Sequence, residues 1–117
     1  MDVPNFKFDE PVPDSAKRLI ARKKGHPKSN ISLLEYPIPS VCDLDKHEVL
    51  IELICAPINY ADLLNMRGYY GTEIPQFPLS LGFEGLFRVL GHGKGVVSLD
   101  RGDLVMVNSY TVGKQCS

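Results

Sequence analysis

The 117-residue sequence lacks tryptophan, has only three cysteines and carries almost no net charge. Thirteen basic residues against fourteen acidic ones leave a net charge of -1, so the composition predicts neither a nucleic-acid partner nor attraction to an anionic membrane. No apolar run approaches the roughly 20 residues that a membrane-spanning helix needs. Cys42, Cys55 and Cys116 are an odd number without Cys-x-x-Cys spacing. This argues against a disulfide framework and a thiolate zinc site, and is typical of a reducing compartment.

What the sequence does contain is a strong signal for one short helix, bounded by residues 59 and 68. Asn59 is a favourable N-cap, and Asp62 stands at the third helical position, where its carboxylate can complete a capping box. Gly68 suits a left-handed C-terminal stop. The spacing i, i+3, i+4 predicts an apolar face made of Tyr60, Leu63 and Leu64. A turn with two phenols, Tyr69-Tyr70-Gly71, follows directly.

Short apolar runs punctuated by proline and glycine predict strands around this helix. They lie at 17–22, 31–36, 48–56, 86–90 and 104–107, with the first two forming an antiparallel pair and the last one buried. In the run 48–56, alternation places Val49, Ile51, Leu53 and Cys55 on one face. Five or six short strands, one helix and no internal repeat predict a mainly β domain, an irregular barrel.

Two stretches of the sequence resemble phosphate-binding elements. The glycine-rich run 91–95 lacks the third glycine and the helix of a dinucleotide fingerprint, and therefore predicts a hairpin turn. The basic cluster from Arg18 to Lys28 is compatible with a phosphate site, although a solvated face of an edge strand is the more frequent cause of such a cluster. We expect a flexible proline-rich arm at 1–16, one domain at 17–107 and a tail at 108–117.

Four motifs in order carry a family resemblance: Ala56-Pro57-Ile58-Asn59-Tyr60-Ala61-Asp62, Arg67-Gly68-Tyr69-Tyr70-Gly71, residues 82–87 and residues 99–105. Together they resemble the N-terminal GroES-like domain of the medium-chain dehydrogenase/reductase superfamily, and especially the mitochondrial 2-enoyl thioester reductases. The resemblance implies a mainly β, GroES-like, irregular and partly open barrel with one or two short helices. It also implies a truncated barrel, because the family adds a further strand and a nucleotide-binding domain beyond this point.

The resemblance assigns roles to two residues. Tyr70 matches the tyrosine that donates a proton in the enoyl thioester reductases, with Tyr69 as its rival one residue earlier. A phenol suits this task, since its ordinary pKa of about 10 keeps it protonated at neutral pH. Asn59 matches a residue near the nicotinamide and is the cofactor-binding candidate, beside its capping role. Glu84 is expected to be structural.

Zinc is not expected. Phe83 stands where the zinc-dependent members of the superfamily have a histidine ligand, and no cysteine directly precedes the helix. A phenyl ring cannot ligate a metal ion. Phe83 also departs from the asparagine frequent in enoyl reductases. The resemblance implies NADPH as the cofactor of the complete enzyme, but this chain has no glycine loop feeding a helix, so we expect it to bind none tightly and to be inactive alone.

The leading interpretation is therefore the substrate-side domain of an NADPH-dependent 2-enoyl thioester reductase of fatty-acid synthesis. Its substrate would be an enoyl thioester of coenzyme A or of acyl carrier protein, and its assembly a homodimer. Family resemblance implies a mitochondrial location, whereas the acidic first residues do not resemble a transit peptide and leave a cytoplasmic one open. Two alternatives remain: a non-catalytic GroES-like binding module, and a fragment of a zinc-free quinone oxidoreductase.

Overall fold

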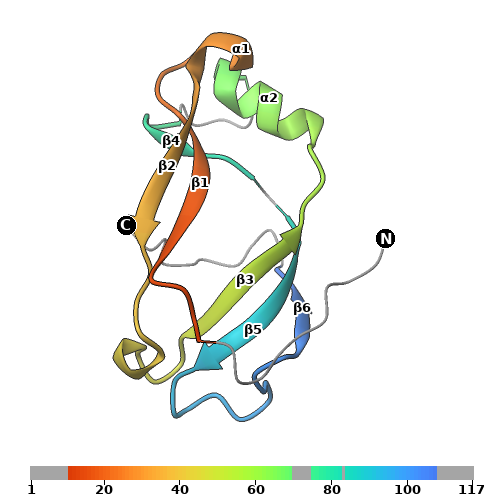
Figure 1. Cartoon of the computed structure of the whole chain (residues 1–117). Helices are drawn as coiled ribbons and strands as arrows, with labels where there is room; N and C mark the ends of the chain where they lie inside the picture. The colour runs from red at the N-terminus through yellow and green to blue at the C-terminus, as the bar shows by residue number, and fades with distance from the viewer. Residues whose placement is uncertain (1–10, 70–74, 83, 108–117) are drawn as a thin grey trace.

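The computed structural model describes residues 11–69, 75–82 and 84–107, which form two three-stranded antiparallel sheets and two short α-helices (Figure 1). One sheet has the order β2-β1-β4 and the other β3-β5-β6. The elements are β1 (Ser15–Ala21), α1 (Pro27–Asn30), β2 (Ile31–Pro37), the 3-10 turn η1 (Val41–Asp43), β3 (Val49–Cys55), α2 (Tyr60–Arg67), β4 (Leu79–Ser80), β5 (Leu86–His92) and β6 (Leu104–Met106). The sheets do not close on each other, which confirms the predicted mainly β, partly open architecture.

The first sheet confirms the predicted antiparallel pair. β1 runs alongside β2 over its whole length, from Ser15 opposite Pro37 to Ala21 opposite Ile31. β1 begins two residues before the predicted domain start. The connection between the two strands contains the one-turn helix α1, which was not predicted. His26 caps it, since its Nδ1 accepts a hydrogen bond from Lys28 N at 3.1 Å. Four residues are too few to show a helical period in a sequence.

The second sheet corrects the predicted face of residues 48–56. Leu50 is buried, whereas Leu53 is 54% exposed. The pairing of β3 with β5 shifts register between Leu50 and Ile51 and again between Leu53 and Cys55. The first shift leaves Leu90 of β5 as the extra residue and the second leaves Ile54 of β3, so the alternation of the two strands does not stay in step. A strict alternation read from the sequence cannot anticipate these shifts.

Two further predictions about this sheet were wrong. The run 91–95 is not a turn throughout, because Gly91 and His92 belong to β5 and pair with β3. The space there requires glycine, since a Cβ at Gly91 would lie 2.6 Å from the Val41 side chain. β6 is not buried: it is an exposed strand, with Met106 77% accessible. The prediction rested on the apolar residues of the run alone, whereas in the described residues β6 has β5 as its one partner.

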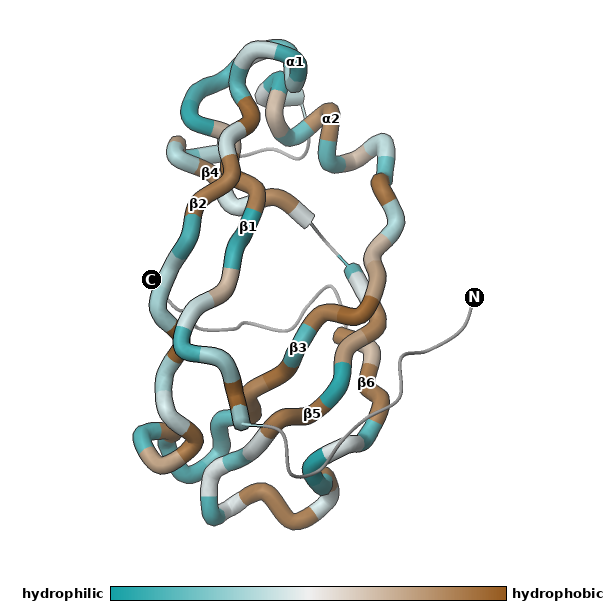
Figure 2. Tube along the Cα trace, in the orientation of Figure 1, coloured by the Kyte–Doolittle hydropathy of each residue, from teal (hydrophilic) through white to brown (hydrophobic). Residues whose placement is uncertain are grey.

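The buried apolar side chains of the described residues belong to both sheets and to α2. Around β1 and α2 the buried apolar residues are Ile20, Ala21 and Met66, and within β3 and β5 they are Leu50, Val89 and Leu90. Figure 2 shows brown, apolar segments along both sheets and a hydrophilic region around α1. In the parts of the chain that the structure describes, no helix has the length and apolar character needed to cross a membrane.

Candidate functional site

α2 is fixed at both ends as predicted. At its start, Asp62 Oδ2 accepts a hydrogen bond from Asn59 N at 3.0 Å, and Asp62 N donates to Asn59 O at 3.0 Å. At its end, Gly68 adopts the left-handed conformation with φ 76°. Tyr69 N then donates to Leu64 O at 2.9 Å. Both caps are local and readable from residue types, which is why the sequence predicted them.

The packing face of α2 differs from the prediction. Tyr60 is 70% exposed, and the buried residue is Met66, only 1% exposed. The reason is that the last turn of the helix packs against the turn between β1 and α1, where Gly25 N donates to Met66 O at 3.0 Å. Periodicity within eight residues cannot reveal which side a distant turn will cover.

The start of α2 is tied to the loop before β5 by side chains 20 or more residues apart. Asp62 Oδ1 accepts from Gly82 N at 3.2 Å, and Asn59 Nδ2 donates to Glu84 Oε1 at 2.5 Å. Glu84 was expected to be structural; the structure gives it a side-chain partner, the cofactor-binding candidate Asn59. The carboxylate thus engages the Asn59 amide nitrogen and restricts the rotation of this amide. No local motif signals a contact between residues 25 positions apart.

The other end of α2 leads to the tyrosine turn. Tyr70, the catalytic candidate, lies outside the described residues, as does Phe83. Tyr69 is described: it is 73% exposed, and Lys24 Nζ lies 5.7 Å from the centroid of its ring. Eight helical residues, about 12 Å of helix at 1.5 Å per residue, separate Asn59 from Tyr69. Asn59 and Tyr69 therefore lie at opposite ends of one helix, α2.

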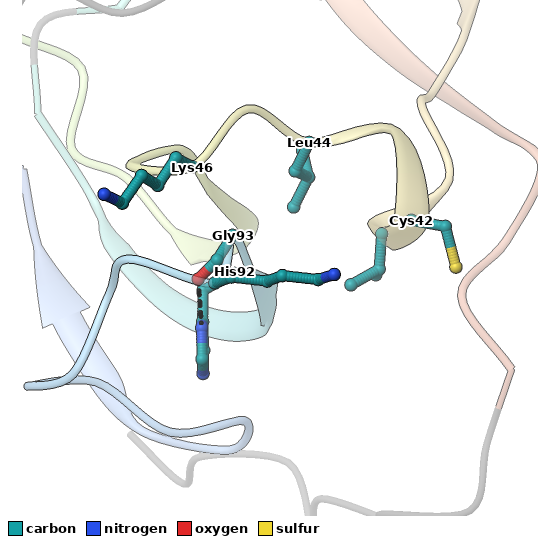
Figure 3. Close-up of a pocket in the computed structure, with 7 residues that line it drawn as sticks. Cys42, Leu44, Lys46, His92 and Gly93 are labelled. Carbon is teal, nitrogen blue, oxygen red and sulfur yellow. Dashed lines mark hydrogen bonds between the residues drawn. The ribbon is translucent and has the colours of Figure 1, made fainter.

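Metal-binding residues do not gather in the described ranges. No group of three or more His, Cys, Asp or Glu side chains is placed there to hold an ion. A separate pocket of about 530 Å³ is lined by Val41, Cys42, Leu44, Lys46, His92, Gly93 and Lys94 (Figure 3). It lies where η1 meets the end of β5, at the end of the molecule opposite to α1 and α2 (Figure 1). Neither Asn59 nor Tyr69 lines it.

Comparison with known domain families gives a match over more than half of the chain. Residues 45–117 match the alcohol dehydrogenase GroES-like domain, a stretch that includes β3, α2, β5 and β6. The chain belongs to this family, as the resemblance of its motifs predicted.

Comparison with individual proteins shows which members of this family the chain is similar to. The chain is 31% identical over 103 residues to the mitochondrial enoyl-[acyl-carrier-protein] reductase of Xenopus tropicalis, covering 88% of this chain and 28% of the relative. Among solved structures, it matches the complex of Etr1p, a mitochondrial 2-enoyl thioester reductase of Candida tropicalis, with NADP and crotonyl-CoA. That match has a TM-score of 0.69 and 26% identity, over 79% of this chain and 27% of the other. Etr1p also forms a heterodimer with Etr2p.

A quinone oxidoreductase is similar as well. The Escherichia coli enzyme in complex with NADPH matches with a TM-score of 0.64 and 30% identity, over 78% of this chain and 26% of that one. The chain thus spans little more than a quarter of the length of each of these relatives. What it shares with them is the region that carries α2 and its two ends.

Proposed function

We propose that this chain is the substrate-side domain of an NADPH-dependent 2-enoyl thioester reductase. The observation that carries the proposal is the helix α2, fixed at both ends and followed in the sequence by Tyr69-Tyr70-Gly71, in a chain similar over 88% of its length to an enoyl reductase. The nucleotide-binding part of the enzyme would be supplied outside these residues. The division into an arm at 1–16, a domain at 17–107 and a tail at 108–117 is part of the proposal.

The reaction assigned to the site is reduction of the 2,3-double bond of an enoyl thioester. NADPH, when bound, supplies the hydride that adds to the β-carbon. Electron density then moves to the thioester oxygen, and a proton must reach the α-carbon. In this proposal the Tyr70 phenol hydrogen-bonds the developing enolate and donates that proton. In the sequence, Tyr70 follows the capped helix α2 by three residues, which supports this assignment.

Asn59 is proposed to contact the cofactor. Its amide is already engaged by Glu84 in the described structure, which supports an orienting role, because an amide with one fixed hydrogen bond has fewer orientations left to lose on binding. Glu84 in this view is a positioning residue that acts through Asn59. Asp62, which accepts from both Asn59 N and Gly82 N, fixes the loop that carries Glu84.

The site is proposed to work without zinc. At the two positions where the zinc-dependent members of the superfamily place ligands, this chain has Phe83 and the run Pro57-Ile58-Asn59. None of these side chains is a thiolate, an imidazole or a carboxylate, the groups that bind Zn²⁺ in proteins. Mitochondrial fatty-acid synthesis is the proposed setting, by similarity to the named mitochondrial reductases. Dimer formation is proposed by the same similarity.

A quinone oxidoreductase is the second candidate, favoured by the 30% identity to the Escherichia coli enzyme. The two candidates differ in their need for a proton donor to carbon. Only the thioester reductase requires a phenol at position 70.

The decisive experiment replaces Tyr70→Phe in a complete enzyme that contains this domain. Turnover of a 2-enoyl thioester should fall by about 10²–10⁴-fold, the usual cost of losing a positioned acid, while affinity for NADPH stays within about twofold. Tyr69→Phe is the matched control, since it deletes the same atom one residue away, and should retain most activity. Damage from Tyr69→Phe instead would move the proton donor to position 69. If neither change mattered, the quinone oxidoreductase would be favoured.

A further inference from the structure

A basic segment of the chain has no part in the function proposed so far. Between Asp14 and Glu35 the sequence contains six lysines and arginines, one histidine and no acidic residue. The whole chain has a net charge of -1, so this concentration does not follow from the overall composition. Here the term "basic turn" means Arg22, Lys23, Lys24 and Lys28 together with Arg67, all of them exposed.

The sheet topology removes the simplest explanation of this charge. Basic residues often protect an edge strand from pairing with another chain. β1, however, is the central strand of its sheet, with β2 on one side and β4 on the other. It ends at Ala21, so all four residues of the basic turn from this segment lie beyond it, in the connection that contains α1. An edge-protecting role therefore does not account for them.

The basic turn is attached to the candidate active site. Gly25 N donates to Met66 O at 3.0 Å, and Lys24 Nζ lies over the Tyr69 ring. The aliphatic part of Lys24 packs close to Gly68, where an added Cβ would lie 2.9 Å from Lys24 Cε. Figure 1 shows α1 and the end of α2 side by side. The charges thus begin beside Tyr69 and extend over α1.

Several of these cations have no acidic partner within the described ranges. The Arg22 side chain donates to Ser32 Oγ at 2.6 Å, a neutral partner, and Lys24 faces an aromatic ring. No ion pair of Lys23, Lys28 or Arg67 occurs in the same ranges. Five like charges gathered on so short a segment repel one another, and this repulsion is relieved when an anion binds.

We propose that the basic turn binds the phosphate groups of coenzyme A. This inference rests on the proposed function for the choice of ligand, but the binding of coenzyme A itself can be measured without any catalysis. Lysine and arginine are the usual ligands of phosphate oxygens. The small extent of the patch, one turn and the neighbouring helix end, favours a compact polyphosphate over a protein surface, which needs about 800 Å² on each partner.

The test is calorimetric titration of the full chain with coenzyme A at low ionic strength. Replacing Lys23→Gln, Lys24→Gln and Lys28→Gln together should weaken binding by roughly tenfold, as three exposed charge contacts of modest strength would. Wild-type affinity should fall as salt rises, and the triple variant should show a smaller salt dependence. Pantetheine, which lacks the phosphates, should bind both proteins equally.

A matched control removes the same charge elsewhere. Lys17→Gln, Lys46→Gln and Lys94→Gln, of which the last two line the pocket near η1, should leave the affinity for coenzyme A within about twofold. Equal weakening by both triples would show that only net charge matters and would overturn the proposal. Absence of coenzyme A binding, with retention of acyl carrier protein by wild type alone, would also overturn it and assign the turn to a protein partner. Either result would leave the proposed function untouched, because the Tyr70→Phe experiment measures turnover and not the binding of coenzyme A.

Discussion

Asn59 combines a structural and a proposed chemical role because its two polar groups are used separately. Its backbone N–H donates to Asp62 Oδ2, while its side-chain nitrogen donates to Glu84 Oε1. The first contact was predictable, since a capping box has a fixed spacing of three residues. The second depends on how the chain returns 25 residues later, which only the folded structure shows.

Glu84 offers a prediction at this scale. Because Glu84 is exposed, its hydrogen bond to Asn59 adds little to stability, and Glu84→Ala should change the free energy of unfolding by less than about 1 kcal/mol. In the complete enzyme, the same change should raise the KM for NADPH several-fold, because the Asn59 amide then rotates freely. Steady-state kinetics and denaturant unfolding together check this.

A conservative replacement of Glu84 distinguishes its orienting effect on the Asn59 amide from the effect of its negative charge. Glu84→Gln keeps an oxygen able to accept from Asn59 Nδ2 and should retain a KM close to wild type. Glu52→Gln, on an exposed position of β3, is the control for loss of one negative charge. A large loss of stability in Glu84→Ala, with unchanged kinetics, would show that Glu84 is only structural.

At the scale of elements, the sequence predicted best where the determinants are local. The caps of α2 and the antiparallel pair of β1 and β2 follow from residue types and alternation within a few positions. The packing of Met66, the register shifts between β3 and β5 and the exposure of β6 depend on neighbours from other parts of the chain. α1 was missed because it is one turn long.

The end of α2 gives the prediction at this scale. Gly68→Ala places a Cβ in the left-handed region, which costs an alanine about 1–2 kcal/mol, and brings this Cβ against Lys24. The melting temperature of the chain should therefore fall by several degrees. Displacement of Lys24 should also weaken the binding of coenzyme A.

A second glycine distinguishes the loss of stability from the loss of coenzyme A binding. Gly102 also has a positive φ, of 98°, but lies in the turn before β6, away from the basic turn. Gly102→Ala should lower the melting temperature by a similar amount and leave coenzyme A binding unchanged. Thermal unfolding and calorimetry on both variants make the comparison, and equal loss of binding would contradict the link between Gly68 and Lys24.

At the scale of the whole molecule, many large apolar side chains of the described residues are exposed. Leu33 is 60% exposed on β2, Leu53 54% on β3, and Met106 77% on β6. Surfaces of this kind are normally covered by another part of a protein or by a second copy. The relatives contain more than three times as many residues as this chain matches in them, and their remaining parts are one source of such cover.

The last prediction concerns β6, which is exposed and, among the described residues, is an edge strand that pairs with β5 alone. An exposed strand with apolar side chains pairs readily with another chain, so the isolated 117-residue protein should self-associate as its concentration rises. Met106→Lys should reduce this association, because a charge on an edge strand opposes strand addition. Sedimentation velocity over a range of concentrations provides the measurement.

Val97→Lys is the control: Val97 is 94% exposed but lies in a loop, so its replacement should leave association unchanged. A strictly monomeric wild type that melts at high temperature would show that the edge is protected within the chain itself.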